Sequence, residues 1–496
     1  MNFDFVIIGS GLGGLVSGII LAKEGHSVCV LEKNHQAGGN LQTFSRFGQT
    51  FNTGLHYIGS MEEGQTLHRF FNYLGIADRL PLVKMDEDGY DRIVFGEEET
   101  VYRHAQGWER FEEEMVKQFP SERDSISTYV KSIREIIRSI PLYDLENAST
   151  HRLDSVQLNR CTIDFLHSIT KNPRLISVLA GANSVYHGAA MRTPLYLHAC
   201  IRNSFVSSAW RINGGSDKLT GLLTETFASL GGMILTEAEV TGFVSQGGRI
   251  TSVELRDGRL IEGKNFISNL HPASTLKLGG LETLRKSYRH RIESLENTAG
   301  FFSLYLVFRD NTFPYLGHNL FQYYHDDYFT DELPENKWPQ TYMIYTPYHD
   351  DNKGFTKTAS VLTFMKREQC RQWESLAANV RGEDYREFRE MASQKLLDMV
   401  EKRFPAIRHN IIEYCDATPL TFTDYTGTPC GSGYGILKDC NDPLRSIITP
   451  KTKIPNLWFT GQSLNIHGVL GTTISAIVTC SEFTGFRNLV NKIVHA

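Results

Sequence analysis

The sequence lacks the features that mark membrane-spanning and nucleic-acid-binding proteins. It has no run of about 18 apolar residues, so we expect no helix to span a bilayer. Its 51 Lys and Arg residues are outnumbered by 56 Asp and Glu residues, giving a net charge of -5. No concentrated basic face of the kind that phosphate binding needs is visible, and we expect no nucleic-acid partner. A hydrophobic fraction of 41% is that of an ordinary folded protein rather than a disordered one.

Cysteine motifs are also missing. The eight cysteines are scattered, with no C-x-x-C pair and no His at zinc-ligand spacing, so we predict no metal site and a reducing compartment. The segment Asn2 to Ile8 already has the pattern of a strand, which leaves no room for a secretory signal. We therefore expect a cytoplasmic protein.

The chain is too long for one core. Its 496 residues exceed the roughly 250 to 300 that a single hydrophobic core organises. Two domains are therefore expected.

The N-terminus carries a glycine motif of the type G-x-G-x-x-G, directly after the predicted strand. It consists of Gly9, Ser10, Gly11, Leu12, Gly13 and Gly14. Gly9 can make the tight turn, Gly11 allows the backbone to approach a pyrophosphate, and Gly14 allows the helix from about Leu12 to Lys23 to pack on the sheet. The N-terminus of that helix would face the phosphates.

A second predicted strand, Ser27 to Leu31, ends at Glu32, whose carboxylate can accept a hydrogen bond from a ribose hydroxyl. Glycine-rich turns also occur for packing alone, but here they stand in strand, turn, helix, strand and acid order. An acid at position 32 favours a free 2'-hydroxyl and disfavours NADP, which would prefer Arg. The motif by itself leaves NAD and FAD open.

A second pair of glycines follows within Lys33 to Thr43. Gly38 and Gly39 again permit close backbone approach to a cofactor. This stretch resembles the doublet-glycine motif of the amine oxidase and phytoene desaturase flavoproteins, which contacts FAD. Many members have Arg after the doublet, whereas this chain has Asn40, so an Arg contact to phosphate is not implied.

Near the C-terminus, the segment from Asn456 to Gln462 has the pattern of a buried strand that ends in Gly461, and Gly468 to Thr473 opens a helix. Such a turn would present backbone N-H groups to a polar cofactor edge, although it also serves as a plain helix cap. The segment resembles the C-terminal FAD segment of carotenoid isomerases and retinol saturases. We therefore predict FAD, bound non-covalently, since nothing around Cys480 suggests attachment.

The middle of the chain contains a further block of the same family. After Trp210 to Ser216 we predict a helix from about 217 to 230 and strands near 233 to 235, 242 to 246 and 250 to 255. Val240 is where the family makes a main-chain contact to adenine, although it could be a plain sheet residue. The stretch from Asn265 to Asn269 resembles a returning strand of the nucleotide domain.

These resemblances imply an α/β fold with a Rossmann-like FAD domain built from separated segments and an α+β substrate domain with a mixed or antiparallel sheet. We assign 1–75, 205–290 and 410–496 to the first domain and 76–204 and 291–409 to the second. Helical patterns fill 76–204, and short aromatic runs in 300–364 predict strands. Together they are expected to enclose an apolar cavity.

The segment Phe51 to Gly59 resembles the stretch beside the flavin in retinol saturases and carotenoid isomerases. It contains two of our three candidate catalytic residues, His56 and Tyr57, and the third, His467, lies in the C-terminal segment. These side chains can assist proton transfer, or they can be packing residues. The residues that we predict to contact FAD are Gly9, Ser10, Gly11, Leu12, Gly13, Gly14, Glu32, Lys33, Gly38, Gly39, Asn40, Leu41, Gly54, His56, Val240, Gly461, Gln462, Gly468, Val469 and Thr472.

The family implies an FAD-dependent oxidoreductase that desaturates, saturates or isomerises carbon-carbon bonds of a hydrophobic polyene such as a carotenoid or retinoid. The alternatives are an amine oxidase and a non-enzymatic escort of prenylated proteins. The basic run Arg285 to Arg291 is either a solvated face or a peripheral contact with an anionic membrane. No second dinucleotide motif identifies the electron partner, and the sequence gives no oligomeric state.

Overall fold

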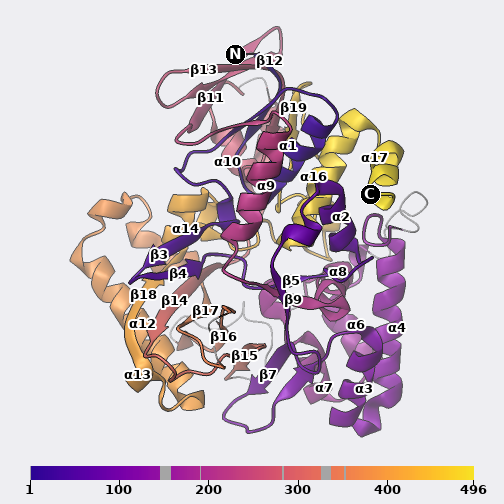
Figure 1. The fold of residues 1–496 in the computed structure, drawn as a ribbon, viewed down its shortest axis with the longest axis vertical. Coiled ribbons are helices and arrows are strands. Elements are labelled where there is room, and N and C mark those ends of the chain that lie inside the picture. The colour runs from indigo at the N-terminus through magenta and orange to yellow at the C-terminus, as the bar shows by residue number, and fades with distance from the viewer. Residues whose placement is uncertain (1, 146–157, 190, 282–283, 325–336, 351–353) are drawn as a thin grey trace.

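The structure is a computed structural model that describes residues 2–145, 158–189, 191–281, 284–324, 337–350 and 354–496. Two large sheets, one above the other in Figure 1, organise the chain. Helices cover the upper sheet and fill the lower right of the view.

The first sheet has seven strands among the described residues. They are β10 (Met233–Leu235), β2 (Val28–Leu31), β1 (Asn2–Ile8), β13 (Leu260–Ser268), β12 (Arg249–Leu255), β11 (Val240–Gln246) and β19 (Leu457–Phe459). β1 pairs in parallel with both β2 and β13, and β13 also pairs in parallel with β19. The core of the sheet therefore joins both ends of the chain to its middle, as predicted. The returning strand β13 begins five residues earlier than the predicted Asn265, because its first half pairs with β12.

Helices α1 (Leu12–Lys23) and α9 (Asp217–Ser229) pack on this sheet. Around α1 lie α16 (Gly468–Thr484) and α2 (Thr66–Leu74), and α17 (Phe486–Val494) packs on both of these helices. Nearly every residue of α1 is buried, and α16 packs against it. A helix that is apolar all round belongs inside a protein, which explains why the two ends of the chain pack together.

The second sheet also has seven strands among the described residues. They are β18 (Ile411–Ala417), β14 (Gly300–Phe308), β17 (Thr358–Met365), β16 (Thr341–Tyr345), β15 (Asn319–Tyr323), β7 (Asp91–Phe95) and β8 (Tyr102–His104). All pairs are antiparallel except β15 with β7. The mixed sheet that we predicted is present. Every residue of β14 to β17 is buried, as in a sheet covered on both faces.

The domain division stays a prediction, but sheet pairing moves one boundary. We predicted that the chain returns to the nucleotide domain at residue 410. Strand β18 instead pairs with β14 of the second sheet from Ser303 to Phe308. Six of its seven residues are partly or fully exposed, without alternation, so the strand has no apolar face that would indicate which sheet it extends.

Helices from the 76–204 segment stand beside the second sheet (Figure 1). They are α3 (Trp108–Gln118), α4 (Arg123–Ser139), α6 (Thr162–Ile169), α7 (Pro173–Ala180) and α8 (Leu195–Ser207). Phe111, Met115, Ile126, Tyr129 and Ile133, which recur at helical spacing in this segment, are buried. The remaining helices are α10 (Pro272–Lys277), α11 (Lys286–Glu293), α12 (Gly382–Arg403), α13 (Ile407–Asn410), α14 (Pro419–Thr426) and α15 (Pro443–Ser446).

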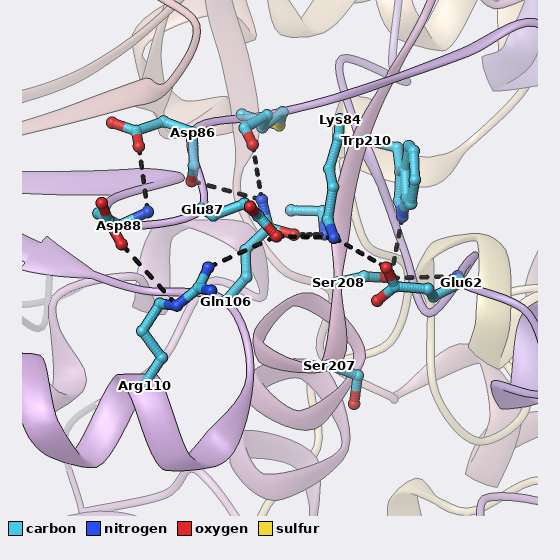
Figure 2. A network of polar contacts seen from close by, with 12 residues as sticks. Glu62, Lys84, Asp86, Glu87, Asp88, Gln106, Arg110, Ser207, Ser208 and Trp210 are labelled. Carbon is cyan, nitrogen blue, oxygen red and sulfur yellow. Dashed lines mark hydrogen bonds and ion pairs between the residues drawn. The ribbon is translucent and has the colours of Figure 1, made fainter.

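Two small sheets lie between the large ones (Figure 1). They are the hairpin β3 (Thr43–Arg46) with β4 (Gln49–Asn52), and the set β5 (Ile58–Gly59), β9 (Ala209–Ile212) and β6 (Leu82–Lys84). At the edge of the second set, Figure 2 shows Lys84 between Glu62 and Glu87, with both N-O distances 2.8 Å. Arg110 of α3 reaches Glu87 at 3.4 Å. These pairs are largely exposed, so each contributes little to stability.

Two of the scattered cysteines are paired, which the sequence did not predict. Cys161 and Cys440 form a disulfide, while the other six cysteines are free. The two partners are separated by 279 residues, and sequence spacing does not reveal a pairing made by tertiary folding. Because disulfides are rare in a reducing cytosol, cysteine usage no longer supports that compartment.

Candidate functional site

A cavity of about 440 Å³ extends from the carboxyl ends of the first sheet's parallel strands to the second sheet. Gly9 follows β1, Glu32 follows β2, Asn269 follows β13 and Thr460 follows β19, and all four residues are on or beside its wall. This edge is where open α/β sheets bind their ligands.

Glycines from three parts of the chain meet at this edge. Gly11 pairs with Gly38 in an isolated β-bridge. A Cβ atom on Gly13 would lie 2.5 Å from the side chain of Asn269 and 2.9 Å from the Cα of Gly461. A Cβ atom on Gly39 would lie 3.1 Å from the Cα of Gly11. The backbone of the two chain ends therefore packs without room for side chains.

Glu32 is buried at the end of β2, and its carboxylate is already held by the protein. Ser10 donates to Oε2 through its N-H at 3.1 Å and its hydroxyl at 2.5 Å, and the N-H of Asn34 donates to Oε1 at 2.9 Å. A carboxylate has about four acceptor sites. Glu32 can therefore accept a further hydroxyl from a ligand in the cavity.

The cavity brings together most of the predicted cofactor residues. Those on its wall are Gly9, Gly11, Leu12, Gly13, Glu32, Lys33, Gly38, Gly39, Asn40, Leu41, Gly54, His56, Val240, Gln462, Gly468, Val469 and Thr472. Ser10, Gly14 and Gly461 are not on it. Ser10 supports Glu32, Gly14 closes against the carbonyl of Gly9, and Gly461 packs on Asn269. Direct contact of the whole set with FAD stays a prediction.

His56 lies on the wall between the two sheets. Its ring stacks on Tyr345 at 4.4 Å, nearly parallel. Burial and the charge of Arg211 lower the pKa of His56 to about 3, so the imidazole is neutral at physiological pH. Its Nε2 is buried and has no hydrogen-bond partner among the described residues. A neutral imidazole facing the cavity can donate or accept one hydrogen bond there.

Tyr57, the next residue, stacks on Phe205 at 4.2 Å. Its hydroxyl is buried, and in the described part of the chain nothing bonds to it. Burial, reinforced by the charge of Asp91, raises the pKa of Tyr57 well above its usual value. The phenol therefore remains protonated and is available as a donor to a ligand.

His467 stands immediately before α16 and is less free. Its Nε2 lies 3.2 Å from the carbonyl of Val185, and its ring stacks on Tyr434. Burial lowers the pKa of His467 to about 4. Because a neutral imidazole must donate to a carbonyl, this proton is already used, and His467 is better suited to holding the loop than to transferring a proton.

Sequence reasoning missed a buried charge cluster behind Tyr57. Arg202 and Asp91 are 1% and 0% exposed and lie 3.8 Å apart. Asn319 donates to Asp91 at 2.8 Å, and Arg202 donates to His104 at 2.9 Å. No sequence signal predicts it, since β7, α8 and β15 are far apart along the chain and none carries a motif.

A second missed residue is Lys438, which is buried behind the C-terminal loop. Its ammonium donates to the carbonyls of Ser446, Ser463 and Leu464 at 2.7, 3.3 and 3.0 Å. Burial lowers the pKa of Lys438 to about 7. Ser463 also lies on the cavity wall. Lys438 therefore fixes the segment that the sequence predicted to contact the flavin.

Two other kinds of feature are absent from the described residues. No group of three or more His, Cys, Asp and Glu side chains is arranged to hold a metal ion. No helix there is long and apolar enough to cross a membrane.

Comparison with known proteins places the chain among enzymes. Residues 7–74 match the family model described as an NAD(P)-binding Rossmann-like domain. All-trans-retinol 13,14-reductase of Danio rerio is 25% identical over 537 residues, covering 98% of this chain and 87% of that protein. Prolycopene isomerase 2, chloroplastic, of an Oncidium hybrid cultivar is 22% identical, with 96% and 83% covered.

A solved structure has the same fold. The oxidoreductase from Methanosarcina mazei superposes with a TM-score of 0.65 at 16% identity and covers 96% of this chain and 99% of its own. The similarity therefore includes both sheets and the helical segment, and not only the nucleotide motif.

Proposed function

Because the chain belongs to the flavoprotein family of phytoene desaturases, carotenoid isomerases and retinol saturases, we propose that it is an FAD-dependent oxidoreductase of conjugated isoprenoid lipids. The reaction is desaturation, saturation or cis-trans isomerisation of a carbon-carbon bond in a carotenoid or retinoid. The single observation that carries this function is the cavity, which continues from the glycine-lined edge into an apolar, aromatic interior.

The described residues fit FAD. Gly11, Gly13, Gly38 and Gly39 line the cavity, where their backbone would face a pyrophosphate, and Glu32 retains an acceptor site for a ribose hydroxyl. The main chain of Val240 would hold adenine, and the loop from Gln462 to Thr472 would hold the ring. Bound FAD would supply hydride or single-electron chemistry. With no cysteine predicted to attach to it, we propose that it is held non-covalently.

The apolar end of the cavity fits a polyene. Its wall there includes Leu55, Ile201, Phe205, Met343 and Leu362, contributed by both the helical segment and the second sheet. Apolar and aromatic walls with few polar groups are typical of sites for hydrophobic ligands. They also exclude water from the reacting carbons.

Within this wall, Tyr57 is the proton donor that the geometry supports best. Its hydroxyl is protonated, buried and without a protein acceptor among the described residues. A positioned donor of this kind can deliver a proton to a carbon atom of the substrate. His56, neutral and held by its stack on Tyr345, would position the substrate or assist through Nε2.

The first test uses the purified protein. Denaturation should release free FAD, and anaerobic incubation with all-trans-retinol or a carotene should change the flavin spectrum or the polyene spectrum. Neither an amine nor a prenylated peptide should do so. Bleaching of the flavin by an amine alone would contradict the proposal and favour the amine oxidase alternative.

We also propose that the protein works in the cytoplasm and contacts a membrane surface peripherally, as a route for a water-insoluble substrate. Helix α11 exposes Lys286 and His290, and Arg291 donates to the carbonyl of Arg445 at 3.3 Å. The neighbouring Leu444 is 73% exposed. A cationic surface with an exposed apolar side chain suits an anionic bilayer.

Co-sedimentation with phosphatidylserine vesicles tests this contact. Binding should weaken with salt and with Lys286→Glu, whereas vesicles of phosphatidylcholine alone should bind less. Absence of binding to the anionic vesicles at low salt would contradict the proposed contact.

A further inference from the structure

A second hollow lies behind Tyr143, on the side away from the main cavity. Its volume is about 180 Å³. The start of α2, the end of α4 and the end of α8 enclose it. Its wall consists of Ser60, Gly64, Gln65, Thr66, Arg69, Ile137, Arg138, Tyr143, Asp144, Leu145 and Ser207.

The two hollows share a wall. Tyr143 lines both, and it is only 6% exposed. Gly59 and Leu67 line the main cavity. Their chain neighbours Ser60 and Thr66 line the second hollow. Each change of side occurs between adjacent residues, and at Tyr143 a single residue separates the two hollows.

Helix α8 runs past this partition. Ser204 lines the main cavity and Ser207 the second hollow, and the rise of about 1.5 Å per residue separates them by about 4.5 Å along the axis. The hydroxyl of Ser60 donates to the carbonyl of Ser204 at 3.1 Å. The hydroxyl of Thr66 donates to the carbonyl of Tyr143 at 3.1 Å. These bonds fix the frame around the Tyr143 side chain.

The two sides differ in chemistry. On the main-cavity side the partition is bordered by Leu67, Cys200 and Ile201. On the other side stand two guanidinium groups, those of Arg69 and Arg138, and one carboxylate, that of Asp144. Arg69 donates through Nε to the carbonyl of Gly64, but within the described residues neither Arg forms an ion pair. The described part of the wall therefore carries an excess of positive charge.

We propose that the second hollow binds the carboxylate end of a long substrate whose apolar chain lies in the main cavity, with the side chain of Tyr143 turned aside. Guanidinium groups recognise carboxylates by two parallel hydrogen bonds, and an apolar chamber joined to a cationic one matches an amphipathic acid. The inference rests on the proposed function, because it assumes that a polyene occupies the main cavity.

Equilibrium binding to the FAD-loaded protein tests the site without turnover. The probes are all-trans-retinoic acid and all-trans-retinol, which share a polyene chain and differ at the end group. The acid should bind more tightly than the alcohol. Arg69→Met and Arg138→Met should each weaken the acid by about tenfold and leave the alcohol within about twofold. Arg134→Met is the matched control on α4, since Arg134 pairs with Glu109 at 2.8 Å instead.

Tyr143 gives an independent test. Tyr143→Phe should leave acid binding unchanged, because only the ring forms the partition, whereas the larger ring of Tyr143→Trp should weaken the acid and leave flavin content intact. Unchanged acid binding in Tyr143→Trp would overturn the connection between the two hollows.

The outcomes separate the two proposals. If the alcohol binds but neither Arg substitution changes the affinity for the acid, the proposed carboxylate site is contradicted and the proposed function stands. If the wild-type protein binds no polyene at all, the proposed function fails, and this inference fails with it.

Discussion

The two ends of the cavity differ in whether backbone or side chains form the wall. At the first sheet the wall is largely backbone, where Gly11 bridges Gly38 and Gly13 packs against Gly461. At the second sheet the wall is made of side chains, such as the stack of His56 on Tyr345 of β16. Backbone contacts require glycine at fixed positions, whereas side-chain walls accept many sequences. The cofactor end is therefore specified by a motif, and the substrate end is not.

The polar groups differ in the same way. Both oxygens of Glu32 accept hydrogen bonds from the protein. At the other end, the hydroxyl of Tyr57, one oxygen of Asp91 and two nitrogens of Arg202 have no hydrogen-bond partner among the described residues. Unsatisfied buried polar atoms cost stability. Of these groups, the Tyr57 hydroxyl is the one on the cavity wall, where a ligand can satisfy it. The Glu32 carboxylate keeps one acceptor site beyond its three hydrogen bonds from the protein.

The largest expected effect is on the backbone wall. Gly13→Val should remove bound flavin and all turnover, because its Cβ would lie 2.5 Å from the Asn269 side chain and 2.9 Å from the Gly461 backbone. The flavin-to-protein absorbance ratio of the purified variant measures this. A Val variant that keeps a full complement of flavin would show that the backbone wall tolerates a side chain at this position.

Low pH is expected to destabilise the second-sheet end of the cavity before the first-sheet end. Burial lowers the pKa of His56, His198 and His318 to about 3 and that of His187 to about 4. Since the unfolded pKa is about 6.5, unfolding takes up protons between these values. The stabilising effect of neutral His is complete above about pH 6.5 and is lost as pH falls toward 3, at about 1.4 kcal/mol per pH unit for each proton taken up.

Hydrogen exchange at pH 7 and pH 5 would measure this acid effect. Protection factors, which compare each exchange rate with the intrinsic rate at the same pH, should fall in α8 and in β15 to β17 before they fall in β1 and α1. An equal fall in both sheets would contradict the difference between the two ends.

Tyr57→Phe tests the chemistry of the side-chain end. Loss of the only hydroxyl assigned to proton donation should lower kcat by about 100-fold, the low end for general acid catalysis, and leave flavin content unchanged. Tyr73→Phe is a suitable control, because the Tyr73 hydroxyl is also buried without a partner among the described residues but is absent from the cavity wall. Equal losses in both variants would assign the effect to packing.

A substitution of His56 should have a smaller effect. His56→Ala is expected to retain flavin and lose about nine-tenths of turnover, because it removes the stack on Tyr345 and the free Nε2 together. Steady-state kinetics with flavin quantification would show it. Unchanged turnover with flavin retained would remove His56 from the mechanism.

The accuracy of sequence-based prediction follows the same division. The strand before Gly9, helix α1 and the acid at Glu32 were all predicted within a few residues, because period, glycine spacing and capping are local signals. The C-terminal strand and helix were also predicted, although they lie at the other end of the chain. Their meeting with Gly13 follows from the family resemblance rather than from either segment alone.

What could not be predicted depends on tertiary contacts between remote segments. Asp91 and Arg202 are charged residues of the kind usually found on a surface, and only the packing of β7 against α8 buries them together. The burial of Lys438 could not be predicted for the same reason, because its partners are backbone carbonyls of another loop. The disulfide of Cys161 with Cys440 likewise has no sequence signature. Charged residues become buried only when folding supplies partners, so composition and periodicity cannot identify them.

The smallest predicted effect returns to glycine. Gly221 lies on the exposed face of α9, and a Cβ atom there would have no heavy atom within 4 Å. Replacing glycine by alanine inside a helix stabilises by about 0.5 to 1 kcal/mol. Gly221→Ala should therefore raise the melting temperature by about 1 to 3 °C and leave flavin content and kcat unchanged. Since Gly221 and Gly13 both lie in helices packed on the first sheet, loss of flavin in Gly221→Ala would mean that this layer is sensitive to any added side chain, and the special role of the backbone wall would be lost.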